Sequence, residues 1–163
     1  MSLLEAITTI DFETEAITNA LPPKPVGVAI KYGSQPSKYY SWGHPGANTS
    51  TFAEACSRLL EAFKGPCLFH NAAFDIAVAY QWMNLAFPAD LHDTILLLFL
   101  YNPHAKELGL KPASERLLKM PPEERDLVAE WLQRNHGIKP KDAGAYISKA
   151  PVSLVGPYAC GDV

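Results

Sequence analysis

Apolar residues follow two different spacings in this chain, and the change between them limits the folds that it can adopt. Residues 6–12 and 25–32 are apolar and rich in β-formers, and the segment between them contains turn residues, so each predicts a strand. Tyr39, Tyr40 and Trp42 indicate a third strand in residues 39–42. From residue 51 to residue 63 the apolar positions recur at helical spacing, which predicts a helix of about four turns.

Short strands and helices alternate after this helix. Residues 66–69 predict a strand, and Asn71 is a suitable cap for a helix that reaches Pro88. Residues 90–94 predict a brief return to extended structure before an apolar helix at residues 95–100. Further helices are expected from about Pro112, from Pro121–Pro122 to about Arg134, and from Pro151 onward. This order predicts an α/β fold with a mixed central β-sheet flanked by helices.

Size and charge narrow the class of protein. The chain has 163 residues, of which 48% are hydrophobic, so we expect residues 1–163 to form one domain. A net charge of -3 argues against nonspecific binding to duplex DNA, so any nucleic-acid function requires a local site. The longest apolar run, residues 95–101, is far shorter than a membrane span, and we expect no membrane partner. The N-terminus lacks the basic segment of a signal peptide, which favours a cytoplasmic protein.

Two acids stand together at the end of the first predicted strand. Asp11 and Glu13 are separated by one residue, and residues at this spacing point to the same face of a strand. The carboxyl end of a strand is where open α/β sheets usually hold their ligands. The alternative is a pair of solvated acids at an exposed strand end.

A second polar segment, His70-Asn71-Ala72-Ala73-Phe74-Asp75, lies where a short buried strand leads into a helix. It has an ordinary structural explanation as well as a functional one. Asn71 would cap the helix, Phe74 would join the core, and Asp75 would favour the positive end of the helix. His70 and Cys67 have half of a metal-binding spacing without a second half, which argues against zinc.

The third segment places a phenol and a carboxylate one helical turn apart. Tyr158 and Asp162 are spaced i and i+4, so they share one helix face, and Pro157 suits the first turn of that helix. An exposed helix pair is the alternative. Asp162 lies one residue from the end of the sequence, so we expect a truncated C-terminal helix with a mobile carboxylate at its end.

Taken in order, these segments resemble the exonuclease motifs of the DEDDy group of 3′-5′ exonucleases, which have the RNase H-like fold. The chain is most similar to the proofreading domain of bacteriophage-type family A DNA polymerases. The resemblance covers almost the whole chain and rests on DFETEA (11–16), FHNAAFD (69–75), LHDTILL (91–97) with LGLKPASERLL (108–118), and PYACGDV (157–163). It implies an RNase H-like fold and a fragment of a longer polymerase, whose polymerase domain would follow as a partner.

The resemblance also implies an activity and a set of site residues. The expected reaction is hydrolysis of phosphodiester bonds at the 3′ end of single-stranded DNA with two divalent ions, Mg²⁺ or Mn²⁺. The implied metal ligands are Asp11, Glu13, Asp75 and Asp162, with Asp11 shared between the two ions. Tyr158 would orient the attacking water, and Asp93 would lie next to the site or cap the helix from Ile95. The implied contacts to the terminal nucleotides come from Thr14, Ile17, Asn71 and Phe74.

Other functions stay open. A related exoribonuclease of the RNase D type would use the same carboxylates and tyrosine. A module that only binds DNA or packs against a polymerase domain is a third possibility, although it would have no reason to keep a repulsive acid cluster. Basic residues near helical spacing predict either contacts to phosphates or a solvated helix face: Lys106, Lys111, Arg116 and Lys119.

Overall fold

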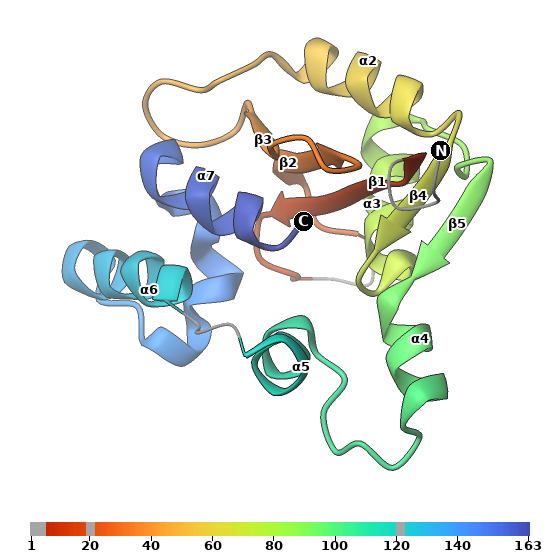
Figure 1. Cartoon of the computed structure of the whole chain (residues 1–163). Helices are drawn as coiled ribbons and strands as arrows, with labels where there is room; N and C mark the ends of the chain where they lie inside the picture. The colour runs from red at the N-terminus through yellow and green to blue at the C-terminus, as the bar shows by residue number, and fades with distance from the viewer. Residues whose placement is uncertain (1–5, 19–21, 120–122) are drawn as a thin grey trace.

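The chain folds around a mixed sheet of five strands (Figure 1). The computed structural model describes residues 6–18, 22–119 and 123–163, so the predicted helix start at Pro121 and Pro122 lies outside the described residues. The strands are β1 Thr8–Thr14, β2 Pro25–Tyr32, β3 Lys38–Ser41, β4 Pro66–Phe69 and β5 Asp90–Asp93. The helices are α2 Phe52–Ala62, α3 Ala72–Met83, α4 Thr94–Tyr101, α5 Leu110–Leu118, α6 Glu123–His136, the 3₁₀ helix η1 Pro140–Lys149, and α7 Val152–Gly161.

The sheet has the strand order β3-β2-β1-β4-β5. The first three strands are antiparallel neighbours, as hairpin-type connections allow. The pairs β1–β4 and β4–β5 are parallel, and helices α2 and α3 make the crossovers that parallel neighbours require. The predicted mixed α/β sheet is therefore confirmed.

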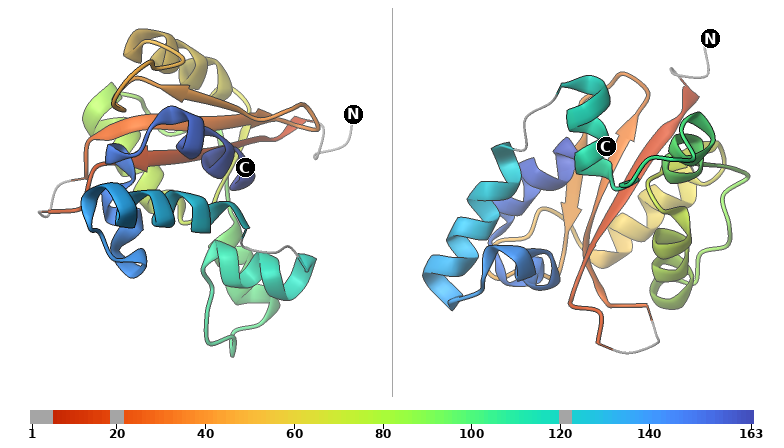
Figure 2. Two further views of the ribbon diagram at one scale, coloured as in Figure 1. Left: turned by 90° about the vertical axis from the view of Figure 1, so that its left-hand side faces the viewer. Right: turned by 90° about the horizontal axis from the view of Figure 1, so that it is seen from below.

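Helices cover both faces of the sheet (Figure 2). On one face, α2 and α3 pack over the central strands, with Ile10, Phe12 and Phe69 among the buried contacts. On the other face, α6, η1 and α7 enclose a second core that includes Ala29 and Leu132. Because side chains alternate along β1, Ile10 and Phe12 enter the first core, and Asp11 and Glu13 point to the face covered by α7.

The strand predictions differ from the structure mainly at β1. The ranges of β2 and β4 agree with the prediction, because each apolar run is bounded by turn residues. The predicted strand at residues 6–12 is wrong by two positions, since β1 runs from Thr8 to Thr14. The two acids therefore lie inside the strand, where Asp11 pairs with Ala29 and Glu13 pairs with Gly27 of β2.

Three helix predictions need correction. The helix after Asn71 ends at Met83 rather than near Pro88, because Asn84 adopts a left-handed conformation with φ 52° and closes the helix. Pro157 lies in the interior of α7 rather than in its first turn, because the helix already begins at Val152. The 3₁₀ helix η1 was not predicted as a separate element.

Helix α4 is entirely apolar except for Thr94, yet none of its residues is buried. Leu100 and Tyr101 are its most exposed side chains, and the helix lies beyond the end of the sheet in Figure 1. Within the part of the chain that the structure describes, this helix and all others are too short or too polar to cross a membrane.

Candidate active site

The sheet opens at the point where the acids of β1 lie. Strand β4 pairs with β1 only at Thr8 and Thr9, and the two strands separate beyond this point. Strand β1 continues through Asp11 and Glu13 with β2 on its other side. The position is a topological switch point, because the strand order β3-β2-β1-β4-β5 reverses between β1 and β4. Such positions are where open α/β sheets bind ligands.

Three of the four predicted metal ligands come together here. Asp11 and Glu13 project from β1, and Asp162 is delivered by the C-terminal end of α7. One carboxylate oxygen from each of these residues lies within 4.8 Å of the others. A cluster of carboxylate oxygens is the donor set that Mg²⁺ and Mn²⁺ prefer, so these residues fit a divalent ion.

Asp75, the fourth predicted ligand, lies outside this group of three. Its Oδ1 accepts a hydrogen bond of 3.0 Å from the backbone N–H of Phe12. The carboxylate therefore takes the place of the strand partner that β1 lacks beyond Thr9. Asp75 is buried, and both its burial and the charge of Asp11 raise the pKa of its carboxyl group.

The carboxylates raise one another's proton affinity. Burial raises the pKa of Asp11 to about 7, and Lys111 opposes this effect. Burial and then the charge of Asp11 raise the pKa of Glu13 well above its ordinary value. A bound divalent cation would stabilise the ionised forms. The repulsion between these ionised carboxylates is therefore consistent with a cation site.

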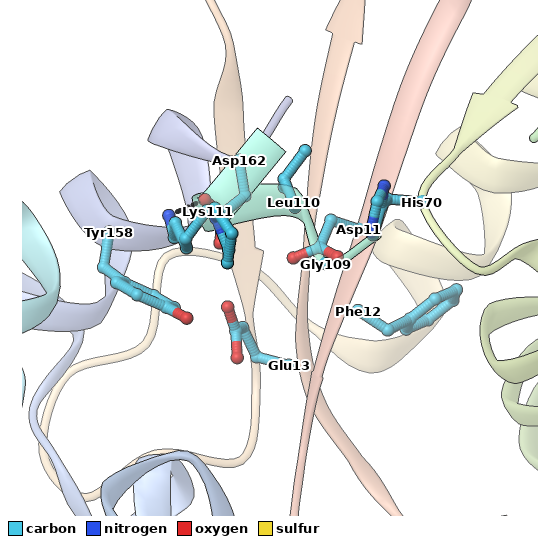
Figure 3. A pocket seen from close by; sticks show the side chains of 10 residues that line it. Asp11, Phe12, Glu13, His70, Gly109, Leu110, Lys111, Tyr158 and Asp162 are labelled. Carbon is cyan, nitrogen blue, oxygen red and sulfur yellow. Dashed lines mark hydrogen bonds and ion pairs between the residues drawn. The ribbon is translucent and has the colours of Figure 1, made fainter. Parts of the chain in front are cut away.

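Tyr158 lies one helical turn before Asp162 and lines the same pocket. Figure 3 shows its hydroxyl end directed toward the carboxylate of Glu13. The pocket has a volume of about 330 Å³ and is lined by Asp11, Phe12, Glu13, His70, Gly109, Leu110, Lys111, Pro112, Tyr158 and Asp162. The phenol and the three carboxylates thus share one open space at the end of the sheet.

Two polar residues of the pocket, Lys111 and His70, are not among the metal ligands or catalytic residues that the sequence predicts. Lys111 forms an ion pair with Asp162, and its Nζ lies 4.8 Å from the centre of the Tyr158 ring. The sequence predicts either a phosphate contact or a solvated position for Lys111, because no spacing pattern connects it with Asp162. His70 Nδ1 lies 2.8 Å from the Thr94 hydroxyl, and burial lowers the pKa of its imidazole. His70 therefore enters the pocket as a neutral side chain near pH 7.

The predicted nucleotide contacts lie outside the pocket lining. Thr14 is buried at the end of β1, and its hydroxyl donates to the carbonyl of Glu15. Ile17 is 68% exposed after the strand. Asn71 is exposed, and Phe74, in the first turn of α3, packs against the first core. Their contacts to a terminal nucleotide stay a prediction.

Asp93 caps two helices at once. One oxygen accepts from the backbone N–H groups of Asn71 and Ile95 at 3.0 and 2.9 Å, and the other accepts from Ala72 at 2.9 Å. The prediction that Asp93 caps the helix from Ile95 is confirmed. The prediction that the Asn71 side chain caps α3 is wrong, because Asn71 has a left-handed φ of 69° and makes no side-chain cap bond. Asp93 from β5 supplies that cap instead.

Replacing Asp93 with alanine should destabilise the protein by about 1–3 kcal/mol, because three backbone N–H groups lose their acceptor. For a domain of this size, each kcal/mol lowers Tm by about 2–4 °C. The measurement is thermal unfolding followed by circular dichroism. Asp90→Ala is the matched control, since Asp90 lies exposed on the same strand. Equal Tm values for the two variants would contradict the capping role.

The chain is similar in fold to several solved nuclease structures. No protein-family model and no curated protein matches the chain. One similar solved structure is the apo form of a nuclease, with a TM-score of 0.63 and 19% identity over 98% of this chain and 67% of the other. Brucella melitensis NrnC with bound Mg²⁺ has a TM-score of 0.59 and 21% identity over 96% of this chain. The chain has an RNase H-like fold.

The RNase H-like chain is shorter than these neighbours. It spans 66% of the length of NrnC. The catalytic core of RRP6 from Trypanosoma brucei has a TM-score of 0.54 and 17% identity, and the match covers 40% of its length. At these identities the likeness supports the fold, and the activity must be argued from the site.

Proposed function

We propose that this chain is a metal-dependent 3′-5′ exonuclease that hydrolyses phosphodiester bonds at the 3′ end of single-stranded DNA. The observation that carries the proposal is the cluster of Asp11, Glu13 and Asp162, whose oxygens lie within 4.8 Å of one another at the switch point of the sheet. Nucleases with the same fold support it, including one with bound Mg²⁺. The 3′-5′ direction of hydrolysis is inferred from the resemblance of the ordered motif segments to those of DEDDy 3′-5′ exonucleases.

The residues of the pocket would have separate roles in hydrolysis. Asp11, Glu13 and Asp162 would hold the divalent ions, and Asp75 would hold the backbone of β1 beside Asp11 through its bond from the N–H of Phe12. Bound divalent ions would supply an activated water and neutralise charge on the scissile phosphate. Tyr158 would orient that water by hydrogen bonding, because its hydroxyl end faces Glu13 across the pocket (Figure 3). The pocket volume of about 330 Å³ is at the small end of ligand sites, which suits one terminal nucleotide.

An exoribonuclease is the second candidate. It is favoured by one neighbour, NrnC, whose structure has been solved bound to pGG. The choice between DNA and RNA depends on whether the site tolerates or contacts the 2′-hydroxyl group. We propose DNA as the substrate because the motif segments are most similar to those of a polymerase proofreading domain. We also propose that the domain edits DNA beside a polymerase domain.

The direct test uses 5′-labelled single-stranded DNA and RNA of matching sequence, each with Mn²⁺, Mg²⁺ or EDTA. We expect a descending ladder of shortened DNA with metal and intact DNA with EDTA. Trimming of RNA with intact DNA would replace our proposal with the exoribonuclease. If neither is cut but DNA binds, the chain is a binding module.

Replacing Tyr158 with phenylalanine should reduce the exonuclease rate by about 100-fold, because a misplaced water loses reactive geometry. Binding of Mn²⁺ should stay unchanged, because the phenol is not one of the clustered ligands. Single-turnover digestion and calorimetry measure the two effects. Tyr146→Phe removes the hydroxyl of a 38% exposed tyrosine on η1 and serves as the control. A full rate for the Tyr158 variant would remove this tyrosine from the mechanism.

A further inference from the structure

A protein cation already contacts the candidate metal site. Lys111 lies in the first turn of α5, and its ammonium group pairs with the carboxylate of Asp162. The side chains are 27% exposed for Lys111 and 8% exposed for Asp162, so the pair is largely shielded from water. Asp162 is one of the three clustered ligands, and the ammonium therefore competes for the oxygens that would bind a metal ion.

The influence of Lys111 reaches the whole cluster. Its positive charge favours the ionised forms of Asp11 and Glu13 against the opposing effect of burial. Figure 3 shows Lys111 beside Asp162, on the same side of the pocket as Tyr158. Lys111 is thus a source of positive charge for three carboxylates that would otherwise repel one another without compensation.

The helix that carries Lys111 is weakly anchored by its own side chains. Ala113 is the buried residue of α5, and Leu117 and Leu118 are 45% and 66% exposed. Gly109 precedes the helix and provides no side-chain cap. Leu110 and Pro112 are half-buried at the pocket, and the bond from Lys111 to Asp162 adds a polar link between α5 and α7.

We propose that Lys111 acts as an exchangeable cation that sets the metal affinity of the site. In the metal-free protein its ammonium holds Asp162 and keeps α5 against the pocket. A divalent ion at the same carboxylates repels the ammonium and displaces it, so metal loading releases α5 from Asp162. This inference rests on the metal site of the proposed function and adds a link between metal occupancy and helix position.

Calorimetric titration with Mn²⁺ tests the exchange directly. If the ion pair is closed nine-tenths of the time, Lys111→Met should bind Mn²⁺ about tenfold more tightly than the unmodified chain. Lys111→Arg keeps the charge and should bind Mn²⁺ like the unmodified chain. Lys106→Met removes an exposed lysine outside the pocket and controls for net charge, so its affinity should also stay unchanged.

Hydrogen exchange of the unmodified chain provides a test without substitutions. Saturating Mn²⁺ should increase amide exchange in residues 110–118, because the helix loses its bond to Asp162. Unchanged or slower exchange of this helix would overturn the displacement.

The outcomes separate this inference from the proposed function. Equal or weaker Mn²⁺ binding by Lys111→Met would overturn the exchange, and the proposed function would stand if the unmodified chain binds Mn²⁺ and digests DNA. Absence of Mn²⁺ binding in both proteins would overturn the metal site, and this inference with it. Tight binding that appears only after Lys111 is replaced would support the exchange.

Discussion

Replacing Asp11 with asparagine should reduce the exonuclease rate by about 10³-fold, which corresponds to about 4 kcal/mol of lost transition-state stabilisation. Asp11 has the central position, because its carboxylate lies with those of Glu13 and Asp162 and its charge raises the pKa of Asp75. An amide removes the charge that a divalent ion requires while keeping nearly the same shape. Single-turnover digestion of labelled DNA with Mn²⁺ measures the loss.

The same substitution should have the opposite effect on stability. Without metal, Asp11→Asn should raise Tm, because it removes a half-buried charge next to other carboxylates. It should also remove most of the stabilisation by Mn²⁺ and the Tm increase that follows from it; this stabilisation is about 2.7 kcal/mol for a ligand at a hundredfold excess over Kd. Asp142→Asn, on the exposed surface of η1, is the matched control. A wild-type Mn²⁺ response in the Asp11 variant would falsify the placement of Asp11 as a ligand.

The metal-free protein should become more stable as the pH falls from about 7 toward about 4. The pKa of Asp11 is raised to about 7 in the folded chain, and those of Glu13 and Asp75 are raised as well. Unfolded carboxyl groups titrate near pH 4, so between these values the folded chain binds more protons than the unfolded chain. We expect Tm in EDTA to be about 5 °C higher near pH 5 than near pH 8.

Divalent metal should reverse this trend. Protons compete with Mn²⁺ for the carboxylates, so the Tm increase caused by Mn²⁺ should be large near pH 8 and nearly absent near pH 5. Differential scanning calorimetry with EDTA or Mn²⁺ at each pH measures both effects. Asp11→Asn should flatten the pH dependence in EDTA, whereas Asp142→Asn should retain it. A Tm in EDTA that rises from acid to neutral pH for the unmodified chain, but not for Asp11→Asn, would contradict the raised pKa values.

Much of the fold could be predicted where local pattern and tertiary structure agree. The apolar run of β2 and the short strand β4 are bounded by turn residues, so their ends could be placed. The spacing of Asp11 and Glu13 was enough to place both on one face, because side chains alternate along any strand. Thr51 at the start of α2 is the acceptor of a regular cap bond from Glu54.

The features that could not be predicted depend on contacts between distant segments. Asp93 caps α3 from the neighbouring strand β5, at a position that local cap rules assign to Asn71. The early separation of β4 from β1 leaves the N–H of Phe12 to Asp75, and no strand pattern contains this information. The mobile carboxylate predicted for Asp162 follows from the length of its helix alone. In the structure, Lys111 on the separate helix α5 forms an ion pair with Asp162, and no local pattern predicts this contact.

The central claim is that Asp11, Glu13 and Asp162 form a site for divalent cations. A crystal structure of the protein grown with Mn²⁺, with anomalous difference density measured at the manganese edge, tests this claim most directly. We predict a peak among the three carboxylates, with the ammonium of Lys111 moved away from Asp162. Ordered carboxylates without a peak at saturating Mn²⁺, or a peak bound only elsewhere on the chain, would contradict the account.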